Sequence, residues 1–312
     1  MVGVPEGLST TLGPLILKHP VINASGTFDA MEAGRIIGDE FISDFPFAAY
    51  IPKTVTLNSR VGNDPPRLYE TAAGLLNSIG LANRGIEAFI SQDLPLLKTL
   101  PVPLIVSVAG ERTEDYGRCA RLLDEIDEVA AIELNISCPN VELDGMALGC
   151  DPDRTRKAVS LTREATSKFL IAKLTPNVTD IVALARAAVA GGADCLSMIN
   201  TVHGMALHPR TLKPVLGHVT GGLSGPAVKP VALRAVYMVT GALDVPVIGM
   251  GGVTTAQDVL EFLAAGASAV AVGTANFRDP LIAESMVSGL RKLMDERGLG
   301  SVEKLIGIAH RP

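Results

Sequence analysis

Short apolar runs rich in β-forming residues recur eight times along the chain, with helical patterns between them. The runs cover residues 21–27, 49–55, 104–109, 131–137, 170–174, 195–200, 245–249 and 269–273. Most are continuously apolar, which is typical of parallel strands covered on both faces. Eight strands alternating with helices favour a closed (β/α)8 barrel over an open doubly wound sheet, and no Gly-x-Gly-x-x-Gly follows the first run. The sequence therefore predicts an α/β fold, a TIM barrel formed as one domain by residues 1–312.

Helices are predicted at residues 113–127, 151–168, 177–190, 232–239 and 254–265. Pro152 falls in the first turn of the second helix, where its missing N–H costs nothing. Gly191 and Gly266 are typical helix ends, and the four residues from Thr254 resemble a capping box. Pro52 lies inside the second predicted strand, and this leaves its boundaries poorly defined.

The composition limits the function classes. Among 312 residues, 47% are hydrophobic and 19% are charged, which supports a large buried core. The net charge is −6 and no Lys/Arg cluster is present, so the sequence predicts neither nucleic-acid nor membrane binding. The N-terminus lacks the pattern of a signal peptide, and the most apolar stretch, residues 262–277, is too short to span a bilayer. Four cysteines without a Cys-x-x-Cys pair support neither a zinc site nor an iron–sulfur cluster, so no metal is expected. They fit a reducing compartment, and we expect a cytoplasmic protein.

Polar and small residues stand at nearly every predicted strand end. In a TIM barrel the chemistry lies at these carboxyl ends. The sites so identified are Ser25-Gly26, Lys53-Thr54, Ser107, Asn135, Ser137-Cys138, Lys173, Asn200-Thr201, Gly251-Gly252 and Gly273-Thr274.

The glycines after the last two strands predict a phosphate site. Glycine lets backbone N–H groups approach an anion closely, and barrels often bind phosphate at this position. Residues 220–226 form a third Gly-rich segment that could add donors. Glycine also ends strands that bind nothing, so the glycines alone leave the phosphate site as one of two interpretations. If a phosphate binds there, it could belong to a sugar phosphate or to flavin mononucleotide. Lys53 and Lys173 favour the flavin, because a lysine can stabilise the negative charge of its reduced ring, although either could extend to solvent.

Cys138 follows the fourth strand beside Asn135, Ser137 and Asn140. A thiol surrounded by hydrogen-bond donors can act as a base, whereas most free cysteines are small buried hydrophobes. Its place at a barrel strand end favours the base.

Several motifs together resemble one family. They are Asn23-Ala24-Ser25-Gly26, Pro52-Lys53-Thr54-Val55-Thr56, Gly62-Asn63-Asp64-Pro65-Pro66-Arg67, Asn77-Ser78-Ile79-Gly80-Leu81-Ala82-Asn83, Asn135-Ile136-Ser137-Cys138-Pro139-Asn140, Ile199-Asn200-Thr201, Gly221-Gly222-Leu223-Ser224-Gly225 and Gly251-Gly252. From about Leu8 to about Phe277 the chain resembles the class 1 dihydroorotate dehydrogenases, flavin-dependent barrels of pyrimidine (UMP) biosynthesis.

The resemblance implies the roles of individual residues. The residues that would bind FMN are Ser25, Lys53, Thr54, Asn135, Lys173, Ile199, Gly225, Gly251, Gly252, Gly273 and Thr274. Those that would surround the substrate are Lys53, Asn77, Ser78, Ile79, Gly80, Leu81, Asn135, Asn140, Asn200 and Thr201. Cys138 would remove a proton from C5 of (S)-dihydroorotate while hydride passes from C6 to FMN. A short N-terminal β extension and a lid loop over about residues 141–150 are also implied, and Ser107 departs from the asparagine that relatives often carry.

Details of the motifs look most like the B-type branch. This likeness implies a homodimer associated with a separate FAD- and [2Fe-2S]-containing electron-transfer subunit, as a heterotetramer that reduces NAD⁺. A fumarate-linked A-type enzyme is the main alternative, and an enzyme like dihydropyrimidine dehydrogenase, acting on uracil or thymine, is another. A flavin-free sugar-phosphate isomerase or synthase is the alternative from a different class.

Overall fold

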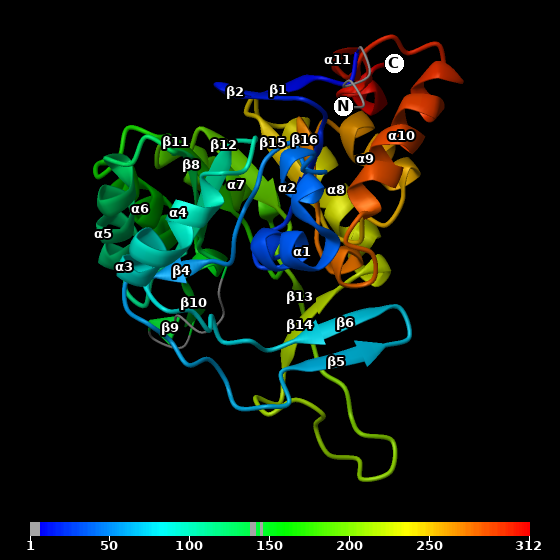
Figure 1. Ribbon diagram of the computed structural model, residues 1–312. Helices are drawn as coiled ribbons and strands as arrows, with labels where there is room; N and C mark the ends of the chain where they lie inside the picture. Colours follow the sequence, from blue (N-terminus) through cyan, green and yellow to red (C-terminus); the bar gives the residue numbers. More distant parts are fainter. Residues whose placement is uncertain (1–6, 138–141, 144–145) are drawn as a thin grey trace.

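The computed structural model describes residues 7–137, 142–143 and 146–312, and at its centre is a parallel sheet of eight strands (Figure 1). In spatial order the strands are β3 (Val21–Asn23), β16 (Ala269–Val272), β15 (Val247–Met250), β12 (Cys195–Met198), β11 (Phe169–Lys173), β8 (Val129–Asn135), β7 (Leu104–Ala109) and β4 (Val55–Thr56). The first strand, β3, pairs with the last, β16, and from β16 to β4 each strand lies beside the next one of the set in the sequence, which is the strand order of a TIM barrel. The predicted fold class is confirmed.

A buried side chain links the two edge strands of the sheet. The Asn23 amide donates to the Ile51 carbonyl (2.7 Å), and its oxygen accepts from the Ile51 N–H (2.8 Å). The Ala48 N–H donates to the Val21 carbonyl over 3.0 Å. These bonds connect β3 to the segment that precedes β4, where the backbone forms no regular ladder.

The prediction of a strand at residues 49–55 is therefore wrong in extent. Only Val55 of this range lies in β4, and Tyr50 forms an isolated bridge with Leu104. Pro52 has no N–H to donate, so it interrupts the ladder. The other seven strands lie where predicted with shifted ends; the first, for example, stops at Asn23 because residues 24–27 turn away.

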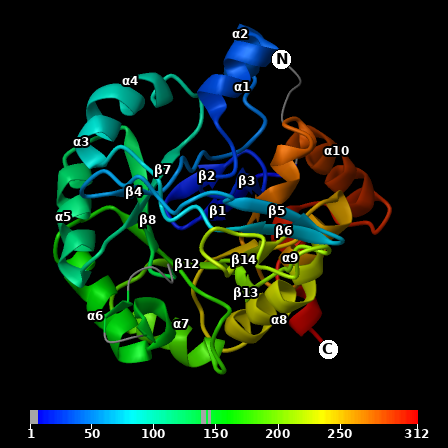
Figure 2. The ribbon, with the colours of Figure 1, turned by 90° about the horizontal axis from the view of Figure 1, so that it is seen from below.

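Helices surround the sheet, as the view from below shows (Figure 2). Those that follow predicted patterns are α5 (Thr113–Asp124), α6 (Pro152–Arg163), α7 (Ile181–Ala190), α8 (Lys229–Thr240) and α9 (Ala256–Ala264). The remainder are α1 (Ala30–Ile37), α2 (Asp39–Ser43), α3 (Ile86–Ala88), α4 (Leu94–Leu97), α10 (Ile282–Asp295) and α11 (Val302–Leu305). None of the helices within the described ranges has the length and hydropathy needed to cross a bilayer.

Side-chain caps decide where several helices begin. Asp151 accepts from the Arg154 N–H at the start of α6, as the Asp-Pro pair predicts. The predicted start of α7 at residue 177 is wrong, because Asp180 caps the helix by accepting from two backbone N–H groups. The capping box of α9 consists of Thr255 and Asp258, one residue later than predicted, because Asp258 rather than Gln257 returns the hydrogen bond.

Two antiparallel hairpins form a second sheet beyond the carboxyl ends of the barrel strands. They are β5 (Leu68–Thr71) with β6 (Gly74–Asn77), and β13 (Val202–Gly204) with β14 (Gly221–Ser224). β14 pairs with β6, which joins the hairpins into one four-stranded sheet below the barrel in Figure 1. This sheet was not predicted from the sequence.

The opposite end of the barrel is closed by the N-terminal hairpin, β1 (Thr10–Leu12) with β2 (Leu15–Leu17). Its leucines join an inner apolar cluster that includes Ile105, Ala131 and Ile171. The predicted N-terminal β extension is therefore present and packs as a plug. In the segment predicted to be a lid, β9 (Glu142–Leu143) pairs with β10 (Met146–Ala147), and its role as a lid stays a prediction.

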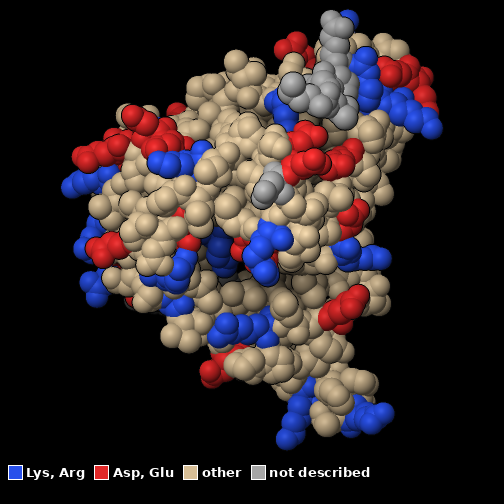
Figure 3. Space-filling view, in the orientation of Figure 1, with Lys and Arg blue, Asp and Glu red and all other residues tan. Residues whose placement is uncertain are grey.

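Charged side chains of both signs are interspersed over most of the face in Figure 3. The loop between β13 and β14 differs, since residues 205–220 carry Arg210 and Lys213 and no acidic residue.

Candidate active site

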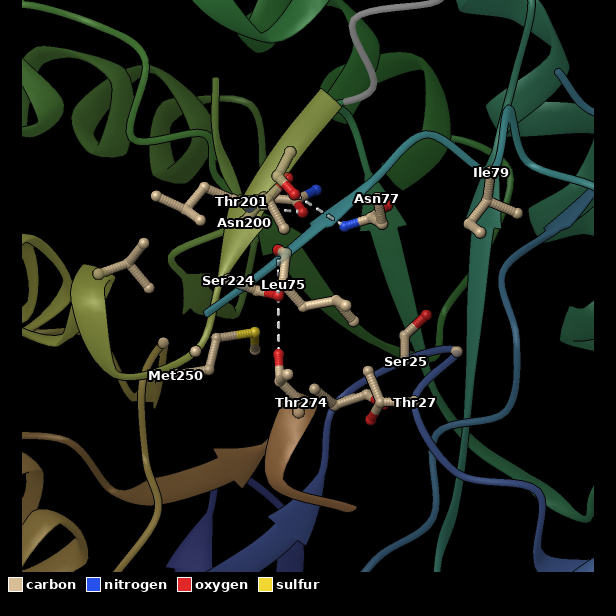
Figure 4. Close-up of a pocket in the computed structure, with 18 of the residues that line it drawn as sticks. Ser25, Thr27, Leu75, Asn77, Ile79, Asn200, Thr201, Ser224, Met250 and Thr274 are labelled. Carbon is tan, nitrogen blue, oxygen red and sulfur yellow. Dashed lines mark hydrogen bonds between the residues drawn. The ribbon is translucent and has the colours of Figure 1, made fainter. Parts of the chain in front are cut away.

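One large cavity lies between the carboxyl ends of the barrel strands and the four-stranded sheet (Figure 4). Its volume of about 1010 Å³ is at the upper end for small-molecule sites, so it can hold a cofactor and a substrate together. Every described residue that the family resemblance assigns to FMN or substrate binding lines this cavity. They are Ser25, Lys53, Thr54, Asn77, Ser78, Ile79, Gly80, Leu81, Asn135, Lys173, Ile199, Asn200, Thr201, Gly225, Gly251, Gly252, Gly273 and Thr274. Cys138 and Asn140 lie outside the described residues.

A chain of hydrogen bonds crosses one wall of the cavity. Thr54 Oγ1 lies 2.9 Å from Ser25 Oγ and accepts from Asn135 Nδ2 over 3.3 Å. Asn200 Nδ2 donates to both Asn135 Oδ1 (3.1 Å) and Ser137 Oγ (3.0 Å). These residues stand at the ends of different strands, so the network holds the two amides in one orientation. Fixed amides of this kind can recognise the rim of a planar polar ring.

Ser107, the departure from the family pattern, supports this wall from behind. Its hydroxyl is 3.0 Å from Thr54 Oγ1 and is fully buried. Ser107 is absent from the cavity lining. It therefore orients Thr54.

The two lysines occupy different surroundings. Lys173 is buried, and its ammonium lies 3.8 Å from the carboxylate of Glu133. Lys53 is half-buried and packs over Gly26, where an added Cβ would lie 2.7 Å from the Lys53 Cδ. Both side chains line the cavity, so the predicted approach of two cations to one ligand is geometrically possible.

The glycines after β15 and β16 line one end of the cavity. Among the described residues, nothing accepts a hydrogen bond from the backbone N–H of Gly251, Gly252 or Gly273. Gly252 has a φ of +73°, and a Cβ there would lie 2.7 Å from the Cβ of Lys229. Unpaired donors on a backbone that tolerates no side chain at Gly251 and Gly252 fit an anionic group such as phosphate.

An ion-paired cluster holds this glycine loop in place. Asp258 accepts from the backbone N–H groups of Thr254 and Thr255, each over 2.9 Å, and pairs with the Lys229 ammonium. Burial opposes ionisation of Asp258, but the hydrogen bond from Lys229 and those from the threonines lower its pKa below the usual value. The donors at the start of α9 are thus occupied by Asp258, which leaves the glycine N–H groups for a ligand.

The hairpin sheet brings further residues to the site that were not predicted from the sequence. Ser224 of β14 accepts from the Thr274 hydroxyl over 2.7 Å and donates to the Leu75 carbonyl over 3.2 Å, as Figure 4 shows. Asn177, which lies between β11 and α7 and does not line the cavity, holds Thr201 in place, because its amide donates to the Thr201 carbonyl over 3.1 Å. Ser224 lay within the recognised Gly-rich segment, whereas Asn177 gave no signal of its own.

The three described cysteines are free thiols and do not line the cavity. Burial raises the pKa of Cys119 to about 12 and that of Cys195 well above its usual value. Burial also raises the pKa of Cys150. These thiols are therefore protonated at neutral pH and are poor bases.

Comparison with known proteins identifies the family. A model of the dihydroorotate dehydrogenase family matches residues 7–294. The chain is 48% identical to the "Dihydroorotate dehydrogenase B (NAD(+)), catalytic subunit" of Geotalea uraniireducens over 98% of both chains. Proteins of the same name from Desulforudis audaxviator and Bacteroides fragilis are 47% and 46% identical, with 97% and 96% of this chain covered and 97% and 98% of the relatives. The chain belongs to the dihydroorotate dehydrogenase family, and these relatives carry the B-type name that its motifs predicted.

Proposed function

We propose that this chain catalyses the oxidation of (S)-dihydroorotate to orotate in pyrimidine biosynthesis, with FMN as its cofactor. The observation that carries the proposal is that one cavity combines a glycine-lined end, which suits an anion, with a wall lined by amides. The family match argues against the flavin-free sugar-phosphate barrel. Relatives named for orotate chemistry and NAD⁺ favour this activity over the uracil-type and fumarate-linked alternatives.

The described residues fit FMN. The glycine N–H groups would hold its phosphate, with Thr274, Gly225 and Ser25 nearby in the lining. Lys173 would lie against the flavin ring, and Lys53, which also lines the substrate region, would face both ligands. FMN, when bound, supplies the acceptor for the hydride from C6 of dihydroorotate.

The substrate would lie against the amide wall. Asn77 and Asn135, whose amides each have a second N–H, would donate to the ring carbonyls and carboxylate, and Asn140 is predicted to join them. Asn200, predicted to surround the substrate as well, would orient Asn135 through its own two N–H groups. Residues Ser78 to Leu81 would form the opposite side with backbone groups. These fixed donors would stabilise the enolate charge that develops as the C5 proton leaves, because they need no reorganisation.

Cys138 would take the C5 proton. It directly follows Ser137, which lines the cavity, whereas the three described cysteines do not line it. The lid predicted over residues 141–150 would exclude water during this step.

The final acceptor is proposed to be NAD⁺, reached through a partner. "Catalytic subunit" in the relatives' names indicates that those proteins have a further subunit. For this chain we propose a homodimer with a separate FAD- and [2Fe-2S]-containing subunit, as a heterotetramer, because its four cysteines include no Cys-x-x-Cys pair. We also propose that the protein is located in the cytoplasm, because four cysteines in 312 residues fit a reducing compartment.

Anaerobic mixing of the FMN-loaded protein with dihydroorotate tests the proposal. The yellow absorbance of the flavin should disappear, and NAD⁺ should restore it only when the partner subunit is present. A colourless protein that FMN cannot reconstitute would overturn the proposal, and restoration by fumarate alone would identify the A-type acceptor instead.

A further inference from the structure

A buried carboxylate stands behind the cavity wall without a role in the proposed chemistry. Glu133 lies on β8, is fully buried and does not line the cavity. Its Oε2 accepts a hydrogen bond from Ser197 Oγ over 2.9 Å. Its Oε1 has no hydrogen-bond donor among the described residues, and the Lys173 ammonium is 3.8 Å away.

This arrangement is costly for the fold. Burying a carboxylate and an ammonium removes both from water, and an apolar pair of similar size is often as stable or more so. The inward residues nearer the plugged end of the same strands, Ala131 and Ile171, are apolar and belong to the inner cluster. Packing therefore does not explain a charge at Glu133.

Lys173 is the only residue of this pair that lines the cavity. Within the described residues its side chain is held by Glu133 alone. The Lys173 backbone is fixed separately, because its carbonyl accepts from Ser137 Oγ over 2.9 Å. Glu133 can therefore affect a ligand in the cavity in two ways: its negative charge lies behind Lys173, and it orients the Lys173 side chain.

We propose that Glu133 is a positioning residue that holds the Lys173 ammonium against the flavin ring and partly offsets its charge. The inference rests on FMN binding as proposed above. Two-electron reduction adds negative charge to the ring, and the net charge of the Glu133–Lys173 pair sets how strongly the site favours that form. Removal of the carboxylate leaves the lysine charge uncompensated and makes the bound flavin easier to reduce.

The test compares the flavin of the wild-type protein with that of Glu133→Gln, which has the same size and can still accept from Ser197. Removing one charge at this range should raise the ratio of reduced to oxidised FMN about tenfold at a fixed potential. That ratio corresponds to a rise of about 30 mV in the two-electron midpoint potential. Sulfite, whose adduct also adds negative charge to the ring, should bind about tenfold more tightly.

Glu133→Asp keeps the charge but withdraws it from Lys173 by one methylene, so its potential should shift in the same direction by less. This variant carries the test if Glu133→Gln does not fold. Asp153→Asn is the matched control, since it removes a carboxylate whose side chain is 94% exposed, and its potential should equal that of the wild type.

A wild-type potential and sulfite affinity in Glu133→Gln would overturn the inference while leaving the proposed function intact. An equal shift in Asp153→Asn would also overturn it, because the effect would then not be local. A wild-type protein that binds no FMN would overturn the inference and the proposed function together.

Discussion

The two ends of the barrel interior are lined by alternate residues of the same strands but have opposite chemistry. Near the N-terminal plug, Ile105, Ala131 and Ile171 pack with the leucines of β1 and β2. Two residues further along their strands stand Ser107, Glu133 and Lys173, which are equally buried and are polar or charged. The two ends therefore differ in chemistry and not in how deeply their side chains are buried.

The difference shows how one strand serves two purposes. Successive inward residues of a strand are two apart, so a single step moves from packing to chemistry. Substitutions at the plugged end should change stability alone, whereas those at the cavity end should change ligand binding or turnover. Four experiments test this division between the two ends.

Cys138→Ala should have the largest effect, and it should fall on turnover. Loss of a general base lowers the rate of flavin reduction by dihydroorotate about 10²- to 10⁴-fold, measured by anaerobic stopped flow. The protein should keep its FMN. Cys119→Ala is the control, because this buried thiol of α5 does not line the cavity and its loss should leave the rate unchanged. Normal flavin reduction in Cys138→Ala would remove Cys138 from the mechanism.

Lys173→Met should show that the cavity end also affects stability. The substitution leaves the buried Glu133 carboxylate unpaired, which costs about 3–5 kcal/mol in the free energy of unfolding. Urea denaturation measures this loss. The double variant Lys173→Met/Glu133→Gln should regain part of the lost stability. A Lys173→Met variant as stable as the wild type would contradict the pairing of Lys173 with Glu133.

Leu17→Ala tests the plugged end. Leu17 is fully buried in the inner cluster, so the cavity left by the substitution should lower the free energy of unfolding by about 3 kcal/mol. The rate of flavin reduction per folded molecule should not change. Its neighbour Ile16, which is 78% exposed, provides the control, since Ile16→Ala should alter neither quantity. A slower reaction in Leu17→Ala would show that the two ends are coupled.

His19 gives the plugged end a pH dependence. Burial, and then the charge of Lys18, lower its pKa from 6.5 to about 3. The unfolded chain therefore binds a proton below about pH 6.5 that the folded protein does not, and stability falls as the pH drops toward 3. The slope should be about 1.4 kcal/mol per pH unit, from urea denaturation between pH 6 and pH 4. His19→Asn should remove this contribution, and an unchanged slope would contradict the assignment.

The candidate site could be predicted to the extent that it depends on strand ends. Each barrel strand is a local apolar run, and the carboxyl ends of parallel strands gather at one face, so Lys53, Asn135 and Asn200 could be grouped from the sequence. Glu133 could not be assigned, because it reads as one charge in a strand until Lys173 is seen beside it. Its partner comes from the next strand, 40 residues later in the chain.

The eight-stranded barrel and the positions at which chemistry could lie could be predicted from the amino-acid sequence, since both follow from local periodicity. Which distant segments meet became known from the three-dimensional fold. β6 and β14 pair in the sheet that lines the cavity although about 145 residues separate Asn77 from Gly222, and these short Gly-containing strands carry no alternating pattern. The three-dimensional fold also shows that the Asn23 side chain connects β3 to the segment before β4, where Pro52 interrupts the ladder. Such pairings depend on complementarity between remote residues, which a local pattern does not contain.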